Sequence, residues 1–289
     1  MRITINGVNA DIQTENEKTV GEVLAGLESW LAGSGHRLSG FSVDGEAAVI
    51  DSMEDSFARE INGIQTIDII TSSLTDLIAE SLEFLLQDIE AWETVKETAG
   101  FDEKAVFAER WKETPEAVLL AEQMPEVYDW TVKTFSGEGA LGAELRLIAE
   151  ERLRELRDPA GEMGRLESAV IQVCERLQQL PLDVQTGKDS EAAGTISFFT
   201  SIGEKVFRIF RVLGTEGFFK EEITVADTPI SVCLAAFGKS LTEMLEAYKQ
   251  KDTVLIGDLA EYEMAPALKN IYSAICEAAG IGLENKIGM

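Results

Sequence analysis

The chain has 289 residues, of which 45% are hydrophobic and 27% charged, and this length is enough for two or three globular domains. Its 52 acidic side chains outnumber 25 lysines and arginines, and the resulting charge of −27 argues against general nucleic-acid binding and against docking on anionic membranes. The first residues lack a signal-peptide core, and no apolar run reaches the roughly 18 residues of a membrane span. We therefore expect a cytoplasmic protein.

Residues 1–73 carry the pattern of a small α/β module. Asn6-Gly7 is a hairpin turn signal, because both residues accept a positive φ. Thr19 and Glu22 have the spacing of a capping box at the start of a helix with apolar residues every three or four positions. Strands are expected at residues 2–5, 9–14, 38–43, 47–50 and 64–70.

The order of these elements, the opening hairpin and the Asp44-Gly45 turn resemble the ubiquitin-like β-grasp superfamily. Sulfur carriers and conjugated modifiers of that superfamily end in a free Gly-Gly, whereas here the last strand runs through residues 71–73 into a helix. The resemblance therefore implies no carrier chemistry. It implies a sheet face or edge that docks a partner, and we expect a partner strand to add to that edge.

Residues 74–160 are expected to form a helical region. Ser73 is the candidate N-cap of a long helix that reaches about residue 97. Three tryptophans, Trp92, Trp111 and Trp130, suggest that this region has its own core. Further helices are expected at residues 102–112, 115–123, 125–135 and 140–157. The turn signal Asp158-Pro159 marks the boundary with the last region.

Residues 161–289 contain amphipathic segments whose apolar spacing alternates between three and four, as in packed near-parallel helices. The segments are residues 164–180, 189–213, 228–248 and 252–279. Pro266 should kink the last of them, and Gly194 and Gly203 suggest close helix approach in the second. We predict an α+β protein in three parts: a β-grasp module (1–73), a helical region (74–160) and a four-helix bundle (161–289).

Few residues indicate a catalytic or metal site. Cys174, Cys233 and Cys276 are widely spaced in apolar stretches, which is typical of buried core thiols in a reducing compartment. His36 is the one histidine, so a His-rich metal site is impossible. It lies in a Gly-rich stretch that is typical of an exposed turn. We expect no cofactor, assign no metal ligand and name no catalytic residue.

Two clusters are candidates for binding. Asp258, Glu261 and Tyr262 lie about one turn apart, with Glu263 beside them. They could hold a cation or act as acid and base, form a polar patch that faces a partner, or be a solvated helix face near the Pro266 kink. Lys188 precedes a helix N-terminus with Asp189 as candidate cap, and such a site can bind an anion, although the cap alone explains these residues.

The scarcity of candidate catalytic residues favours a non-enzymatic interaction protein, an adaptor or assembly factor of a bacterial-type cytoplasm. Its partner would be a protein, which the acidic charge suggests is basic, and self-association stays open. One alternative is a chaperone-like bundle for a secreted or flagellar partner, because residues 185–199 are similar to helical bundle proteins of bacterial flagellar assembly. The other is a small-molecule enzyme that uses carboxylates of the helical region, which clustered carboxylates of raised pKa in a cleft would favour.

Overall fold

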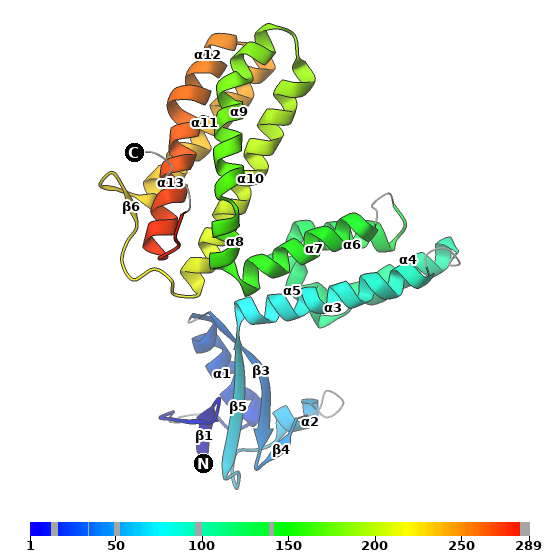
Figure 1. The fold of residues 1–289 in the computed structure, drawn as a ribbon. Coiled ribbons are helices and arrows are strands. Elements are labelled where there is room, and N and C mark those ends of the chain that lie inside the picture. The colour runs from blue at the N-terminus through cyan, green and yellow to red at the C-terminus, as the bar shows by residue number, and fades with distance from the viewer. Residues whose placement is uncertain (13–16, 34, 49–52, 96–99, 139–141, 284–289) are drawn as a thin grey trace. The chain divides into compact units, whose positions relative to one another are not determined.

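The computed structural model describes the chain except for residues 13–16, 34, 49–52, 96–99, 139–141 and 284–289. Two compact units are present, Met1–Glu150 and Glu151–Met289. An N-terminal mixed sheet is followed by helices, which confirms the predicted α+β class (Figure 1). The finer division at residues 73 and 160 stays a prediction.

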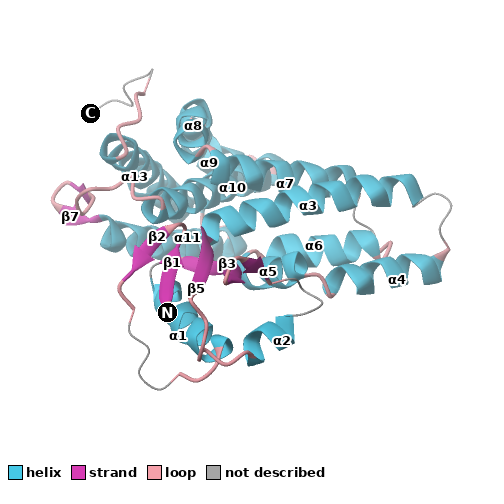
Figure 2. Ribbon diagram, turned by 90° about the horizontal axis from the view of Figure 1, so that it is seen from below, coloured by secondary structure: helices cyan, strands magenta, loops and turns pink. Residues whose placement is uncertain are grey.

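The described residues of the first unit form a five-stranded sheet in the order β2-β1-β5-β3-β4. The strands are β1 (Arg2–Ile5), β2 (Val8–Ala10), β3 (His36–Val43), β4 (Glu46–Ala47) and β5 (Thr66–Ser73). β1 pairs in parallel with β5, and the other pairs are antiparallel. Helix α1 (Val20–Gly33) packs on one face of the sheet through an apolar core that includes Ile3, Val23 and Ile67 (Figure 2).

The short-range signals of this module are confirmed. Asn6 and Gly7 form a two-residue turn with φ of 49° and 78°. Thr19 Oγ1 accepts from the Glu22 N–H at 3.3 Å, and a Glu22 carboxylate oxygen accepts from the Thr19 N–H at 3.4 Å. This reciprocal pair satisfies backbone donors that the first turn of α1 would otherwise leave without partners.

The strand boundaries differ from the prediction. β2 ends at Ala10 and β4 at Ala47, so the predicted strands 9–14 and 47–50 are shorter, and their far ends lie partly outside the described residues. β5 extends to Ser73 because it pairs with β3 along its length. Helix α2 (Met53–Ala58) has no counterpart in the prediction.

The helices that follow in the first unit enclose an aromatic core. They are α3 (Leu74–Val95), α4 (Phe101–Lys112), α5 (Pro115–Gln123), α6 (Pro125–Phe135) and α7 (Gly142–Arg157), which ends in the second unit. The Ser73 cap is confirmed, because Ser73 Oγ accepts from the Asp76 N–H at 3.0 Å. The rings of Trp92 and Trp111 lie 5.7 and 5.6 Å from Phe135, whereas Trp130 is exposed. The predicted ends of α3 near residue 97 and of α7 at residue 140 lie outside the described residues.

The second unit has four long helical segments around one apolar core (Figure 1). Short helix α8 (Pro159–Arg165) precedes them, and Asp158, predicted as part of a turn, caps it by accepting from the Gly161 N–H at 3.0 Å. The segments are α9 (Glu167–Gln185), α10 (Asp189–Thr215), α11 (Ile230–Gln250) and a rod made of α12 (Thr253–Asp258), η2 (Leu259–Met264) and α13 (Ala265–Ala278).

Two of these helical segments contain a proline, and the backbone accommodates each proline differently. α9 continues through Pro181 and does not end near residue 180 as predicted. α12 passes this point at Gly257, where an added Cβ would lie 3.3 Å from Pro181 Cγ. Just before Pro266 the rod contains the π-helix η2. The Ala265 N–H there donates to the Ala260 carbonyl. A π-turn shifts the backbone pairing by one residue, so the proline's missing N–H and its ring are accommodated without ending the helix.

The glycine and cap predictions are partly wrong. The ring of Phe237 packs against Gly203, 3.8 Å from the position of an added Cβ, but nothing lies within 4 Å of that position at Gly194. Close helix approach therefore does not explain Gly194. Lys188 occupies the N-cap of α10 and Asp189 is the first helical residue, so Asp189 is not the cap.

A strained hairpin precedes α11. Strands β6 (Thr224–Val225) and β7 (Thr228–Pro229) are joined by Ala226 and Asp227, whose φ angles are 47° and 63°. Two positive φ angles define a turn of type I′, which favours Asn or Gly over Ala because the Ala Cβ crowds the backbone.

We expect Ala226→Asn to raise the free energy of unfolding by about 0.5 kcal/mol, because Asn tolerates the left-handed region better than Ala. Chemical denaturation would measure this change. The control is Ala193→Asn on the exposed side of α10, which should lower stability by about 0.5 kcal/mol through helix propensity. Destabilisation by both substitutions would contradict the strain assigned to Ala226.

Candidate functional site

An apolar groove of about 660 Å³ lies between strand β2 and helix α1 in the N-terminal module. It is lined by Ile5, Ala10, Asp11, Ile12, Glu17, Val23, Gly26, Leu27 and Trp30. Trp30 is 64% exposed. A tryptophan on the wall of an apolar groove is a common centre of protein binding, because burial of its large ring contributes much of the binding free energy.

Gly26 is the second unusual feature of the groove. It lies in the interior of α1 on its exposed side, where glycine costs about 1 kcal/mol relative to alanine. Nothing lies within 4 Å of where its Cβ would be, so packing within the fold does not require glycine. The missing side chain leaves open the space that the groove occupies beside Trp30.

The sequence of α1 carries a signal for this groove. The core stripe of α1 is formed by Val20, Val23, Leu24, Leu27 and Leu31. Trp30 falls outside that stripe and lies one turn after Gly26, so a tryptophan and a glycine share the solvent side of an amphipathic helix. The place of β2 beside them could not be read from the sequence.

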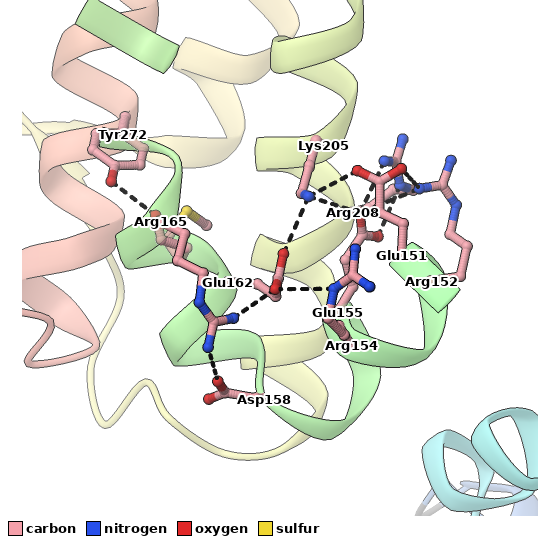
Figure 3. A network of polar contacts seen from close by, with 11 residues as sticks. Glu151, Arg152, Arg154, Glu155, Asp158, Glu162, Arg165, Lys205, Arg208 and Tyr272 are labelled. Atoms are coloured by element: carbon pink, nitrogen blue, oxygen red, sulfur yellow. Dashed lines mark hydrogen bonds and ion pairs between the residues drawn. The ribbon is translucent and has the colours of Figure 1, made fainter. Parts of the chain in front are cut away.

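Several ionisable groups form a network in the second unit, which we call the α7–α10 charge network (Figure 3). It joins residues of α7 and α8, together with Asp158 between them, to two cations of α10. Its members are Glu151, Glu155, Asp158 and Glu162 with Arg152, Arg154, Arg165, Lys205 and Arg208. The sequence analysis did not predict it.

Two cations of α10 bind the central carboxylates. Lys205 Nζ lies 2.7 Å from Glu151 Oε1 and 3.1 Å from Glu162 Oε2. Arg208 donates from Nε and Nη2 to the two carboxylate oxygens of Glu155, at 3.0 Å each. Burial raises the pKa of Glu151, but the Lys205 hydrogen bond and the charges of Lys205, Arg152 and Arg208 outweigh it, so the pKa ends below its ordinary value.

The α7–α10 charge network therefore holds the end of α7 and helix α8 against α10. Glu151 is a poor proton carrier in this setting, because the cations beside it favour its ionised form. Tyr272 adds a link between α13 and α8, since its hydroxyl donates to the Met163 carbonyl at 2.8 Å (Figure 3). The geometry assigns the network a positioning role.

We expect Glu155→Ala to lower the free energy of unfolding of the second unit by about 3 kcal/mol. The Glu155 side chain is only 3% exposed and pairs with Arg208 and Arg152, and the substitution removes this buried carboxylate from both cations. Denaturant titration would measure the loss. Glu243→Ala, which removes the exposed Lys239–Glu243 pair of α11, is the control and should cost less than about 0.5 kcal/mol. Equal losses would show that the network does not hold these helices.

The predicted patch of Asp258, Glu261, Tyr262 and Glu263 lies on the rod of the second unit, and all four residues are exposed. Glu261, Tyr262 and Glu263 fall within the π-helix η2. The Ser240 hydroxyl of α11 donates to the Glu263 carboxylate at 2.7 Å, and Tyr262 is 70% exposed. The patch is thus open to solvent, and its binding role stays a prediction.

Lys188 lies in the connection between α9 and α10. Its ammonium is 3.4 Å from Asp183 Oδ1, and its backbone N–H donates to the Asp183 carbonyl. Asp189 beside it pairs with Lys251 at 3.4 Å. These contacts account for Lys188 within the fold, and anion binding there stays a prediction. His36, expected in a turn, is instead the exposed first residue of β3.

The burial that was predicted for all three cysteines is found for two of them. Cys174 and Cys276 are buried, and burial raises the pKa of each thiol to about 11. Cys233 is partly exposed on α11.

We therefore expect iodoacetamide at pH 8 to modify Cys233 in the folded protein and all three cysteines in urea, as counted by mass spectrometry. Rapid labelling of Cys174 or Cys276 under native conditions would contradict their placement in the core.

Among the described residues of the first unit, Asp88 is a carboxyl with a raised pKa. Burial and the nearby charge of Glu116 raise the pKa of Asp88 on α3, while Arg110 and a hydrogen bond from Trp111 act in the opposite direction. Asp88 does not line the groove beside β2. A single carboxyl of this kind does not form the carboxylate cluster that the enzyme alternative needs.

Comparison with protein families gives two partial matches. Residues 1–73 match the family model described as TP0873 N-terminal domain, and residues 163–274 match the one described as Domain of unknown function (DUF8042). No curated protein and no solved structure matches the chain. The first match covers the N-terminal α/β module that carries the groove, and the second covers the chain from α8 into α13.

In the described ranges, no group of three or more His, Cys, Asp or Glu side chains is arranged to hold a metal ion. None of the helices in those ranges is long and apolar enough to cross a bilayer.

Proposed function

We propose that this chain is a non-enzymatic protein-interaction protein, an adaptor or assembly factor, and that its N-terminal module binds the partner in the β2–α1 groove. The single observation that carries the proposal is the exposed Trp30 on the wall of that apolar groove. Binding would cover the ring and the apolar floor beneath it, which is the usual source of affinity in protein interfaces.

The proposal includes a finer assignment of the module to the ubiquitin-like β-grasp fold. Its support is the strand order β2-β1-β5-β3-β4, the parallel pairing of β1 with β5, and one helix packed on the sheet. β5 continues directly into α3, so the module has no free C-terminal tail for carrier chemistry.

The proposed setting follows from charge and thiol chemistry. Four basic and twelve acidic residues occur in residues 1–73, which favours a basic partner over nucleic acid. Cys174, Cys233 and Cys276 are free, in keeping with a reducing cytoplasm. Self-association, the chaperone-like role and the carboxylate enzyme remain alternatives that no observation here favours.

The test is capture of a partner by the tagged full-length chain in its own organism, followed by binding of the purified partner. We expect Trp30→Ala to weaken that binding by about 2 kcal/mol, roughly thirtyfold, because the ring fills the centre of the interface. Trp130→Ala is the control, since it removes another exposed tryptophan of the first unit that does not line the groove. A partner held equally by both variants, or no partner in repeated trials, would refute the proposal.

A further inference from the structure

We infer that Asn62 is a site of spontaneous covalent modification, at which the side-chain amide cyclises onto the backbone nitrogen of Gly63 and is then hydrolysed to aspartate and isoaspartate. The fold protects the other Asn-Gly pair of the chain, Asn6-Gly7, from the same reaction. This inference does not depend on the proposed function, because the turn that contains Asn62 does not line the β2–α1 groove.

The two Asn-Gly pairs of the sequence are closely matched. Isoleucine precedes both of them, and a β-branched apolar residue follows both. Asparagine followed by glycine is especially prone to cyclisation, because glycine has no Cβ to crowd its own nitrogen or to restrict the backbone. In an unfolded chain the two pairs should therefore react at similar rates. Any difference between them in the folded protein must come from the structure around each asparagine.

The fold holds the Asn6 amide at three points. Its Nδ2 donates to the carbonyl oxygen and to the hydroxyl oxygen of Thr71, at 3.3 and 3.0 Å, and its Oδ1 accepts from the Thr71 N–H at 2.9 Å. Thr71 belongs to β5, an interior strand of the sheet. These hydrogen bonds must break before the Asn6 Cγ can approach the Gly7 nitrogen, so they slow the reaction there.

The Asn62 amide has no comparable restraint. The residue is exposed, and among the described residues its side chain makes no hydrogen bond. It lies in the turn before β5, which a hydrogen bond from the Ile64 N–H to the Ile61 carbonyl closes at 3.2 Å. That bond does not use the Gly63 N–H, and Gly63 has a φ of 99°, which glycine adopts without strain. The amide carbon and the attacking nitrogen are therefore both accessible.

The reaction needs only the chain and water. The Gly63 nitrogen gives its proton to hydroxide and forms a bond to the Asn62 Cγ, and the Cγ–Nδ2 bond breaks. The departing nitrogen takes a proton from water and leaves as ammonia, which regenerates the hydroxide. Water then opens the cyclic imide. Cleavage of the new bond to Cγ gives aspartate, whereas cleavage of the bond to the main-chain carbonyl carbon gives isoaspartate, in which the main chain runs through Cγ.

Isoaspartate would disturb the contacts on both sides of this turn. It lengthens the main chain by the Cβ of residue 62, inside the turn that Ile61 and Ile64 close. Before the turn, the Ile61 N–H donates to the Lys18 carbonyl at 3.0 Å, and after it Ile64 is buried in the core of the module. A longer backbone cannot keep both positions unchanged, so the isoaspartyl form should be less stable than the aspartyl form.

The first test is storage of the full-length chain at pH 8, in native buffer and in urea, followed by peptide mass spectrometry. We expect Asn6 and Asn62 to react at similar rates in urea, and Asn62 to react more than about tenfold faster than Asn6 in the folded protein. Storage in water enriched in heavy oxygen should place one solvent oxygen in the product at residue 62. Equal rates at the two residues in the folded protein would overturn the inference.

Two variants test the site and its consequence. Asn62→Gln keeps an amide on a longer side chain that closes a ring less readily, so this variant should form no isoaspartate at residue 62 during storage. Freshly prepared Asn62→Asp carries the charge of the product without the longer main chain, and it should unfold at the same urea concentration as fresh wild type. Stored wild type should contain a fraction that unfolds at a lower urea concentration, equal to the fraction labelled by an isoaspartyl methyltransferase.

The outcomes separate the site from its effect. Isoaspartate formed to the same extent in stored Asn62→Gln as in stored wild type would overturn the assignment to Asn62. Isoaspartate at residue 62 with an unchanged urea midpoint would overturn the effect assigned to the longer backbone. An equally low midpoint for fresh Asn62→Asp would attribute the loss of stability to charge, and would likewise overturn that effect.

Discussion

The N-terminal module depends on the parallel pairing of β1 with β5, which brings together segments about sixty residues apart in the chain. That pairing makes β1 and β5 interior strands and places Ile67 and Ile69 under α1 in the core. It also leaves β2 with a neighbour on one side. A short strand at an edge, next to a helix with a glycine at its exposed face, creates a groove that neither element has alone.

Natural proteins usually protect such edges, because unpaired backbone groups attract other strands. Here β2 has three residues, and acidic side chains lie beside it. Both features limit pairing between copies of this strongly acidic chain.

The second unit is organised by a different constraint. Its helices share an apolar core, but apolar packing alone tolerates sliding and rotation of helices. The α7–α10 charge network adds directional contacts, because Glu155 accepts two bonds from Arg208 and Lys205 lies between Glu151 and Glu162. Buried pairs of this kind contribute little net stability relative to an apolar replacement but penalise arrangements that separate them. They determine where α8 lies against α10.

Local signals in the sequence determined much of the secondary structure. The Asn6-Gly7 turn, the Thr19–Glu22 and Ser73–Asp76 caps, and the first-turn prolines of α5 and α6 act within four residues, so they can be read without the fold. Apolar periodicity likewise predicted the long helices of the second unit. The helix end predicted near residue 180 is wrong, because a packed helix can continue through a proline, here Pro181, where neighbouring helices hold it. At Pro266, where a kink was predicted, the rod contains a π-helix just before the proline.

Tertiary structure alone decided which of these elements meet. Lys205 and Arg208 lie about fifty residues beyond Glu151 and Glu155, and no periodicity in the sequence links them. Likewise, Trp30 and Gly26 are visible on α1 in the sequence, but their meaning depends on β2 being the strand beside them. The sequence by itself determined the helices, the turns and the acidic charge, because these arise from interactions between near neighbours. The groove and the charge network arise from contacts between distant segments, and only the packed chain brings those segments together.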